Sequence, residues 1–219
     1  MVASLELPAL HVEGENDLHT VVHLLRRHDI ALDKDLGPVV VKPAGSAEKL
    51  LAAAPRAVEA STGRSVGFVI DANGAVADRW RAVCDRLNDV NDVGLPPFPV
   101  TLPDGGYIEQ STRYKAMVGV WIMPDNKTDF GKLEDLVRTL VPEGDRLFPH
   151  AESATQEAKE KLSAAFSEPD RIKATLHCWL AWQKEPGQRF GTALRALYFR
   201  DDSEVALRFV AWFRRLCNL

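Results

Sequence analysis

The chain has 219 residues, 46% of them hydrophobic, and a formal net charge of −4, a composition typical of ordinary globular proteins. Its length fits one domain with an appendage, and a core of that size needs no metal or disulfide for folding. The acidic balance argues against a broad basic nucleic-acid-binding surface and a polybasic membrane patch. No apolar run approaches the roughly 18 residues of a membrane span.

The cysteines and the N-terminal residues predict a cytoplasmic protein. Cys84, Cys178 and Cys217 are odd in number and far apart, without a Cys-x-x-Cys motif, which is typical of a reducing compartment. The N-terminal residues lack a basic segment followed by an apolar stretch, so we expect no signal peptide.

Apolar periodicity predicts strands alternating with helices in the first part of the chain. Short continuous apolar runs indicate strands buried on both faces, and apolar residues at helical spacing follow each of them. The expected strands are 7–12, 38–42, 66–70 and 117–123. The expected helices between and after them are 18–25, 47–54, 75–90 and 131–140.

Later segments predict irregular and helical structure. Residues 92–106 are rich in Pro and Gly and predict a connection with one edge strand at most, at 98–102. The expected helices in the last third are 152–166, 170–183, 191–199 and 203–216. The apolar residues of the last helix would pack in the core or form a homodimer surface.

Together these elements predict an α/β fold with a mostly parallel sheet flanked by helices. We expect residues 1–150 to form this unit and the helical segment 151–219 to pack on it as part of the same domain. From Arg171 onward nine Lys and Arg stand against four Asp and Glu. An acidic front and a basic tail suit a carboxylate metal site facing a phosphate-binding wall, although surface charge also varies this much by chance.

Acidic and amide side chains follow three of the expected strands. Glu13 and Asp17 follow the first, Asp71 and Asn73 the third, and Asp125 the fourth. Sites in open α/β sheets lie at the carboxyl ends of strands. Converging carboxylates repel one another unless a cation neutralises them, and Mg²⁺ and Mn²⁺ prefer oxygen ligands. The pattern predicts a divalent metal site, with turn and helix-cap roles as the alternative.

Two segments resemble the Toprim domain of topoisomerases, primases and the overcoming-lysogenization-defect (OLD) nucleases. They are LHVEGEND at 10–17 and GFVIDANG at 67–74. The Toprim pattern is a Glu at the end of the first strand and Asp-x-Asp after a later strand, and the nuclease branch adds an Asp four residues after the Glu.

Three further segments resemble a Toprim-like family of uncharacterised bacterial proteins, so the resemblance covers most of the chain. They are VWIMPDN at 120–126, GKLED at 131–135 and KATLHCWLAWQ at 173–183. The Glu motif alone is weak, and the order of Glu, Asp-x-Asn and Leu-Glu is more specific.

The resemblance implies roles for individual residues. Asp17 and Asp71 would coordinate Mg²⁺ or Mn²⁺, and Glu13 would be a ligand or general base. Glu134 would be a further ligand, unless it only stabilises a helix N-terminus. Asn73 departs from the pattern, because its amide oxygen can bind a metal but brings no charge, and this puts a second metal in doubt.

Three other residues are weaker candidates. Lys173 and His177 are four residues apart and share one helix face. Lys173 could contact the scissile phosphate, or it could be a solvated lysine beside a packing histidine. Asp125 is a further ligand or simply a turn residue.

The resemblance implies a metal-dependent nuclease that hydrolyses phosphodiester bonds in DNA or RNA, in bacterial defence or repair and beside a separate ATPase partner. Two alternatives remain open. One is a non-catalytic module that binds a metal or nucleotide, and the other is a different phosphotransfer such as primer synthesis or phosphatase action.

Overall fold

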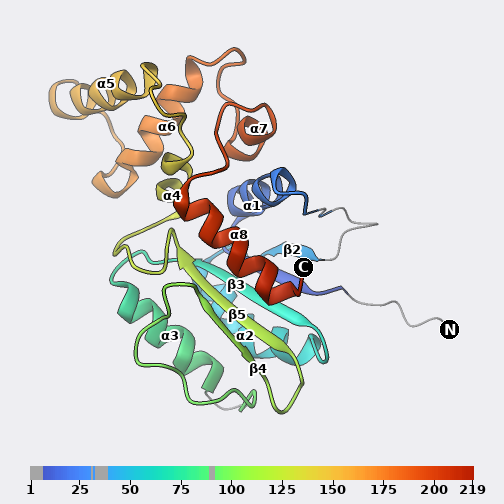
Figure 1. Cartoon of the computed structure of the whole chain (residues 1–219). Coiled ribbons are helices and arrows are strands. Elements are labelled where there is room, and N and C mark those ends of the chain that lie inside the picture. The colour runs from blue at the N-terminus through green and yellow to red at the C-terminus, as the bar shows by residue number, and fades with distance from the viewer. Residues whose placement is uncertain (1–6, 31, 33–38, 89–91) are drawn as a thin grey trace.

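The computed structural model describes residues 7–30, 32, 39–88 and 92–219. Within them, five strands form one sheet in the order β2-β1-β3-β5-β4 (Figure 1). Four strands run parallel and β4 is antiparallel to β5. The strands are β1 (Ala9–Val12), β2 (Val40–Pro43), β3 (Ser65–Asp71), β4 (Tyr107–Gln110) and β5 (Met117–Met123).

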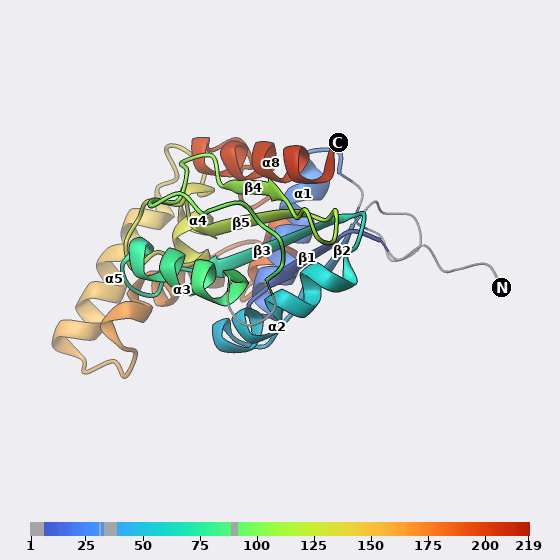
Figure 2. The ribbon, with the colours of Figure 1, turned by 90° about the horizontal axis from the view of Figure 1, so that it is seen from below.

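Helices cover both faces of the sheet, which explains why β5 is apolar throughout and β3 is apolar between its first and last residues. Figure 2 shows α2 (Ala47–Ala60) and α3 (Val76–Asn88) on one face, with α1 (Glu15–Arg27) and α8 (Glu204–Cys217) on the other. Alternate residues of β5 point into the two cores, Val120 toward α2 and α3 and Trp121 toward α8.

The remaining helices lie beyond one end of the sheet (Figure 1). They are α4 (Leu133–Thr139), α5 (Leu147–Lys161), α6 (Arg171–Ala181) and α7 (Phe190–Arg195), with a short 3₁₀ turn at Glu168–Asp170. Their buried side chains belong to the same core as β1, β3 and β5. The expected fold class, a mostly parallel sheet flanked by helices with a helical C-terminal segment packed on it, is confirmed.

Several predicted boundaries are wrong. The expected edge strand at 98–102 does not form, and β4 occupies the sheet edge instead, because the prolines at 96, 97 and 99 have no N–H for a ladder. Helix α5 begins at Leu147 rather than 152, since Pro149 lies in its first turn, where an N–H is not needed. Helix α2 continues through the buried Pro55. Pro38 and residues 89–90, at the ends of expected elements, lie outside the described residues.

Two glycines allow α8 to lie directly on the sheet. A Cβ at Gly67 would stand 2.6 Å from Leu10 Cδ1 and 2.7 Å from Leu216 Cδ2, and one at Gly119 would stand 2.8 Å from Leu216 Cδ1. Leu10 and Leu216 are buried and have no room to yield. Side chains at these two strand positions would therefore push the helix away from the sheet.

Gly67→Ala is expected to lower the free energy of unfolding by about 1–3 kcal/mol through overpacking. Urea denaturation measures this change. Gly74→Ala is the matched control, because its Cβ would meet nothing closer than Ala72 O at 4.0 Å. Equal stabilities of the two variants would contradict this account of the helix–sheet contact.

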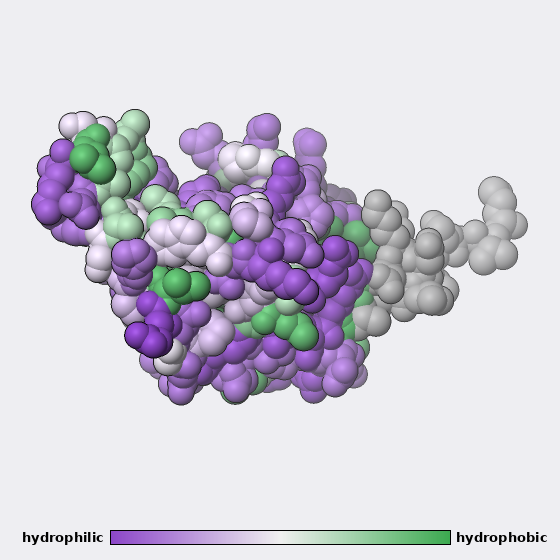
Figure 3. Space-filling model, turned by 90° about the horizontal axis from the view of Figure 1, so that it is seen from above, coloured by the Kyte–Doolittle hydropathy of each residue, from purple (hydrophilic) through white to green (hydrophobic). Residues whose placement is uncertain are grey.

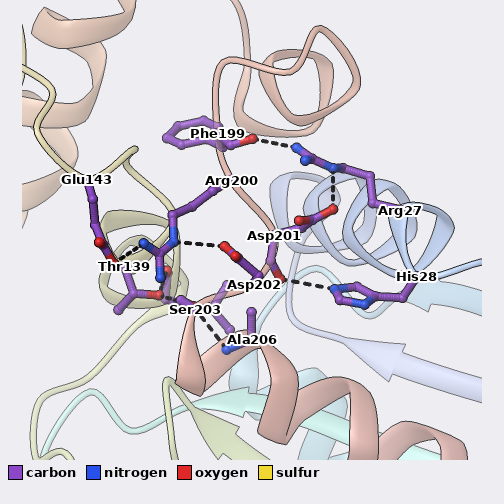
Figure 4. Close-up of polar contacts among 11 residues, drawn as sticks. Arg27, His28, Thr139, Glu143, Phe199, Arg200, Asp201, Asp202, Ser203 and Ala206 are labelled. Carbon is purple, nitrogen blue, oxygen red and sulfur yellow. Dashed lines mark hydrogen bonds and ion pairs between the residues drawn. The ribbon is translucent and has the colours of Figure 1, made fainter.

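A polar network joins the segment before α8 to α1 and α4 (Figure 4). Arg27 Nε pairs with Asp201 Oδ2 at 2.7 Å, and the same guanidinium donates to the Phe199 carbonyl. Ser203 Oγ lies 2.8 Å from Thr139 Oγ1 and accepts the Ala206 N–H, which caps α8. The segment before α8 is thus connected to helices α1 and α4 by polar contacts as well as by a shared core.

The apolar face of α8 packs in the core of the protein. Phe209, Val210, Trp212, Phe213 and Leu216 are buried, so core packing rather than a dimer surface accounts for them. Over the face in Figure 3, hydrophilic residues predominate and hydrophobic residues form separate patches. Among the described residues, no helix has the length and apolar character needed to cross a bilayer.

Candidate metal and phosphate site

The chain reverses its direction across the sheet at β1. From β1 it passes through α1 to β2 on one side, whereas β3 pairs with the other side of β1. The helices of these two crossovers, α1 and α2, lie on opposite faces. In open α/β sheets, ligands bind at the carboxyl ends of the strands that flank such a point. Glu13 directly follows β1, and Asp71 is the last residue of β3.

Two hydrogen bonds connect Glu13, Asp71 and Leu133 along this edge of the sheet. The backbone N–H of Asp71 donates to Glu13 Oε1 at 2.7 Å, and Asp71 Oδ1 accepts the N–H of Leu133 at 3.0 Å. Leu133 begins α4, so Glu134 lies in the first turn of that helix. Asp71 therefore links the end of β1 to the start of α4.

Asp17 comes from the first turn of α1, which begins two residues after Glu13. A Cβ at Gly14 would stand 3.3 Å from Asp17 Oδ2, so the turn between strand and helix leaves little space beside this carboxylate. The short β1–α1 connection is what brings Asp17 to the same edge as Asp71.

These groups surround a small polar cavity of about 200 Å³. This is less than the roughly 300–1,000 Å³ of pockets for drug-sized ligands, and it suits an ion with its waters or a phosphate group. The lining residues are Asn16, Asp17, Asp71, Asn73, Lys132, Leu133, Glu134, Pro169, Asp170, Ile172 and Lys173. Glu13 is not in the cavity wall but stands behind Asp71, as its hydrogen bond to the Asp71 N–H requires.

The carboxylates of the site oppose one another's ionisation. Burial, followed by the charges of Glu13, Asp17 and Glu134, raises the pKa of Asp71 to about 8, against the donated Leu133 N–H. Burial and then Glu13 raise the pKa of Asp17 to about 6, and burial also raises the pKa of Glu13. The surroundings of the site therefore do not stabilise the form in which all of these carboxyl groups are ionised.

Two lysines supply the positive charge in the cavity wall. Lys173 Nζ lies 3.4 Å from Glu134 Oε1, whose side chain is only 10% exposed, whereas that of Lys173 is 45% exposed. Lys132 Nζ lies 3.4 Å from the Pro169 carbonyl and 4.0 Å from Asp170 Oδ1. Among the described lining residues, these two ammonium groups face four carboxylates.

The described side chains of the cavity offer the oxygen donors that a hard divalent cation prefers, but they are not arranged as a complete coordination shell. Asp17, Asp71 and Glu134 offer carboxylate oxygens, which Mg²⁺ and Mn²⁺ prefer. Within the part of the chain that the structure describes, no three His, Cys, Asp or Glu side chains are arranged as a ready metal-binding group. Mg²⁺ commonly keeps several waters and one or two carboxylates, so an ion here would be held partly through water.

Three predicted residues lie differently from the others. Asn73 lines the cavity but is exposed, and its φ of +49° is one that Asn tolerates better than most residues, which gives it a local structural reason. Asp125 accepts the N–H groups of Lys127 and Thr128, and so it stabilises its own turn. The ring of His177 stacks on Phe190 with centroids 5.1 Å apart, outside the cavity wall.

The structure adds residues that sequence reasoning missed. Lys132 and Asp170 line the cavity, and the Leu133 N–H binds Asp71. Lys132 directly precedes Leu133 and Glu134 in a segment with a recognisable motif, so its position was a usable signal. Asp170 follows no strand, and only the packing of α6 beside α4 brings it to the cavity.

No curated protein and no solved structure matches this chain. Residues 8–218 match the model of a protein family described as a protein of unknown function (DUF3226). The match spans every element of the fold and all the residues of the cavity. The chain therefore belongs to the DUF3226 family.

Proposed function

We propose that this protein is a Toprim-type, metal-dependent nuclease that hydrolyses phosphodiester bonds in DNA or RNA. One observation carries the proposal: the carboxylates of Asp17, Asp71 and Glu134 share a small cavity with Lys173 at the switch point of the sheet. The order of these residues along the chain, and their resemblance to the Toprim nuclease pattern, support the same function.

In this proposal Asp17, Asp71 and Glu134 hold Mg²⁺ or Mn²⁺, with Asn73 as a neutral fourth donor. When bound, the metal supplies a Lewis acid that polarises a phosphoryl oxygen and acidifies a bound water. Lys173 orients the phosphate and stabilises the charge that develops on it. Glu13 keeps Asp71 in position by accepting the Asp71 N–H, and we assign it this positioning role because it lies outside the cavity wall.

Substrate affinity is expected to be modest without a partner. Phosphate contacts dominate nucleic-acid affinity, and the chain carries a net charge of −4. A separate ATPase partner, as the resemblance suggests, would supply further contacts. We place the nuclease in bacterial defence or repair, in the cytoplasm, as part of the same proposal.

The arrangement of Asn73 and Glu134 favours one alternative. Asn73 brings no charge, and Glu134 already has Lys173 as a partner. A neutral Asn73 and a Glu134 paired with Lys173 would suffice for a site that binds a single metal or a nucleotide without cleaving it. The alternative is therefore a non-catalytic partner module.

Cleavage assays test the proposal. The protein is incubated with plasmid, single-stranded DNA and transfer RNA in Mg²⁺, Mn²⁺ or EDTA, and we expect metal-dependent cutting of at least one polymer. Asp17→Asn should lose this activity. Asp78→Asn is the matched control, because Asp78 is also the third residue of its helix, α3, yet is exposed and pairs with Arg81. Metal binding without cutting of any polymer would favour the non-catalytic module.

A further inference from the structure

A second cavity adjoins the carboxylate cavity. It measures about 570 Å³ and is lined by Asn73, Phe130, Lys132, Glu168 and Pro169. Asn73, Lys132 and Pro169 also line the first cavity, so the two spaces share one wall. The first cavity suits an ion with its waters or a phosphate group, whereas the second is large enough for an organic group attached to a phosphate.

Phe130 is the aromatic member of this second cavity and is 74% exposed. Its φ is +58°, a backbone conformation that favours glycine or asparagine. The ring belongs to neither core of the protein. Packing among the described residues therefore does not explain a large apolar side chain at this position.

The backbone on both sides of Phe130 is held in place. The Phe130 N–H donates to the Gly74 carbonyl at 2.7 Å, and Asp129 Oδ1 accepts the Val76 N–H at 2.8 Å. The Gly131 carbonyl accepts the Ala72 N–H at 2.9 Å. These bonds tie the loop to the segment that follows β3, so the backbone that carries the ring is held beside the carboxylate cavity.

The charges around the second cavity also suit a nucleotide unit. Lys132 stands in the wall that both cavities share, where the phosphate of a bound nucleotide would pass from one to the other. The carboxylate of Glu168 is paired with Arg171 Nη2 at 2.6 Å, so its charge is compensated at the far side. An aromatic face beside a lysine is the combination that binds unstacked bases in single-stranded nucleic acid.

We propose that Phe130 is a stacking platform for an unpaired base of single-stranded nucleic acid whose phosphate occupies the carboxylate cavity. This inference rests on the proposed function and adds a substrate class to it. Inside a base-paired duplex both faces of each base are covered by neighbouring pairs, and only the terminal pairs expose a face, so single strands are preferred over duplexes.

The test is a binding measurement that does not need cleavage. Fluorescence anisotropy follows a labelled oligonucleotide of about 20 nucleotides, as DNA and as RNA, beside a blunt duplex of the same sequence. Ca²⁺ replaces Mg²⁺, and a denaturing gel checks that the strands stay intact. The variants are Phe130→Ala, Phe130→Trp and Leu197→Ala, the last as a matched control, because Leu197 is 71% exposed with a φ of +62° and lines neither cavity.

We expect tighter binding of the single strand than of the duplex. Phe130→Ala should weaken single-strand binding by about 5- to 150-fold, the range that loss of one stacked base gives, and Phe130→Trp and Leu197→Ala should change it little. Equal binding of Phe130→Ala and the unaltered protein, or equal binding of duplex and single strand, would overturn the inference. If a free mononucleotide displaces the labelled oligonucleotide as strongly as unlabelled oligonucleotide does, the assignment of the ligand to a polymer is overturned. If no polymer is cut but Phe130→Ala still weakens single-strand binding, the nuclease proposal is rejected and the stacking proposal stands.

Discussion

Asp71→Asn is expected to lower the rate of metal-dependent cleavage by at least about 100-fold. Loss of groups that merely orient metal ligands costs roughly 10- to 100-fold, and Asp71 is proposed as a ligand at the centre of the site. The Asn oxygen can still accept the Leu133 N–H that Asp71 Oδ1 accepts now. The fold is therefore expected to survive the change, which circular dichroism and the unfolding midpoint verify.

Asp125→Asn is the matched control for this rate measurement. Asp125 also follows a strand, but its carboxylate is occupied by the N–H groups of its own turn. Its replacement should leave the cleavage rate within a few fold of the unaltered protein. An active Asp71→Asn variant would show that metal and chemistry, if present, lie elsewhere.

Asp71→Asn is also expected to change how stability depends on pH in the absence of metal. The pKa of Asp71 is raised from 3.8 to about 8 in the folded protein. A raised carboxyl pKa contributes stability that is complete below pH 3.8 and is lost as the pH rises through 8. The unaltered protein should therefore lose stability relative to Asp71→Asn across this window, by an amount on the order of a few kcal/mol.

Urea unfolding in EDTA at several pH values measures this difference. Comparison with the variant removes the contribution of titrating groups that do not act on Asp71, so the difference reports Asp71 together with the charges of Glu13, Asp17 and Glu134 that raise its pKa. Addition of Mg²⁺ at high pH should stabilise the unaltered protein far more than the variant, because only binding to the folded state shifts the equilibrium. Stabilities that change in parallel with pH would contradict the described coupling among the carboxylates.

The fold class and part of the cavity follow from local sequence patterns. The continuous apolar runs that became β3 and β5 are buried on both faces, and this alone indicates a parallel sheet covered by helices. Given such a sheet, residues directly after neighbouring strands must share one edge. Asp17 and Asp71 could therefore be placed at one edge without coordinates, whereas Glu134, which follows β5 by eleven residues, is expected there only from the resemblance to the Toprim nuclease pattern.

The parts that sequence reasoning missed depend on contacts between distant segments. Phe130 faces the site only because its N–H binds Gly74 and because Gly131 binds Ala72, and no local pattern specifies such loop contacts. The sequence predicts an edge strand among the prolines at 98–102. The edge strand that forms is instead 107–110, whose residues have the backbone N–H groups needed to pair with β5. The position of Glu13 behind Asp71 likewise arises from one hydrogen bond between strand ends.

The most direct test of the central claim, that the carboxylate cavity holds a divalent cation, is a Mg²⁺ or Mn²⁺ titration by calorimetry in two buffers of different ionisation enthalpy. Asp71 must lose a proton to bind a cation, and its pKa is about 8, so binding near neutral pH should release close to one proton. The account predicts a buffer-dependent heat that disappears in Asp71→Asn. A protein that binds no divalent cation, or binds it equally well with Asn at position 71, would contradict it.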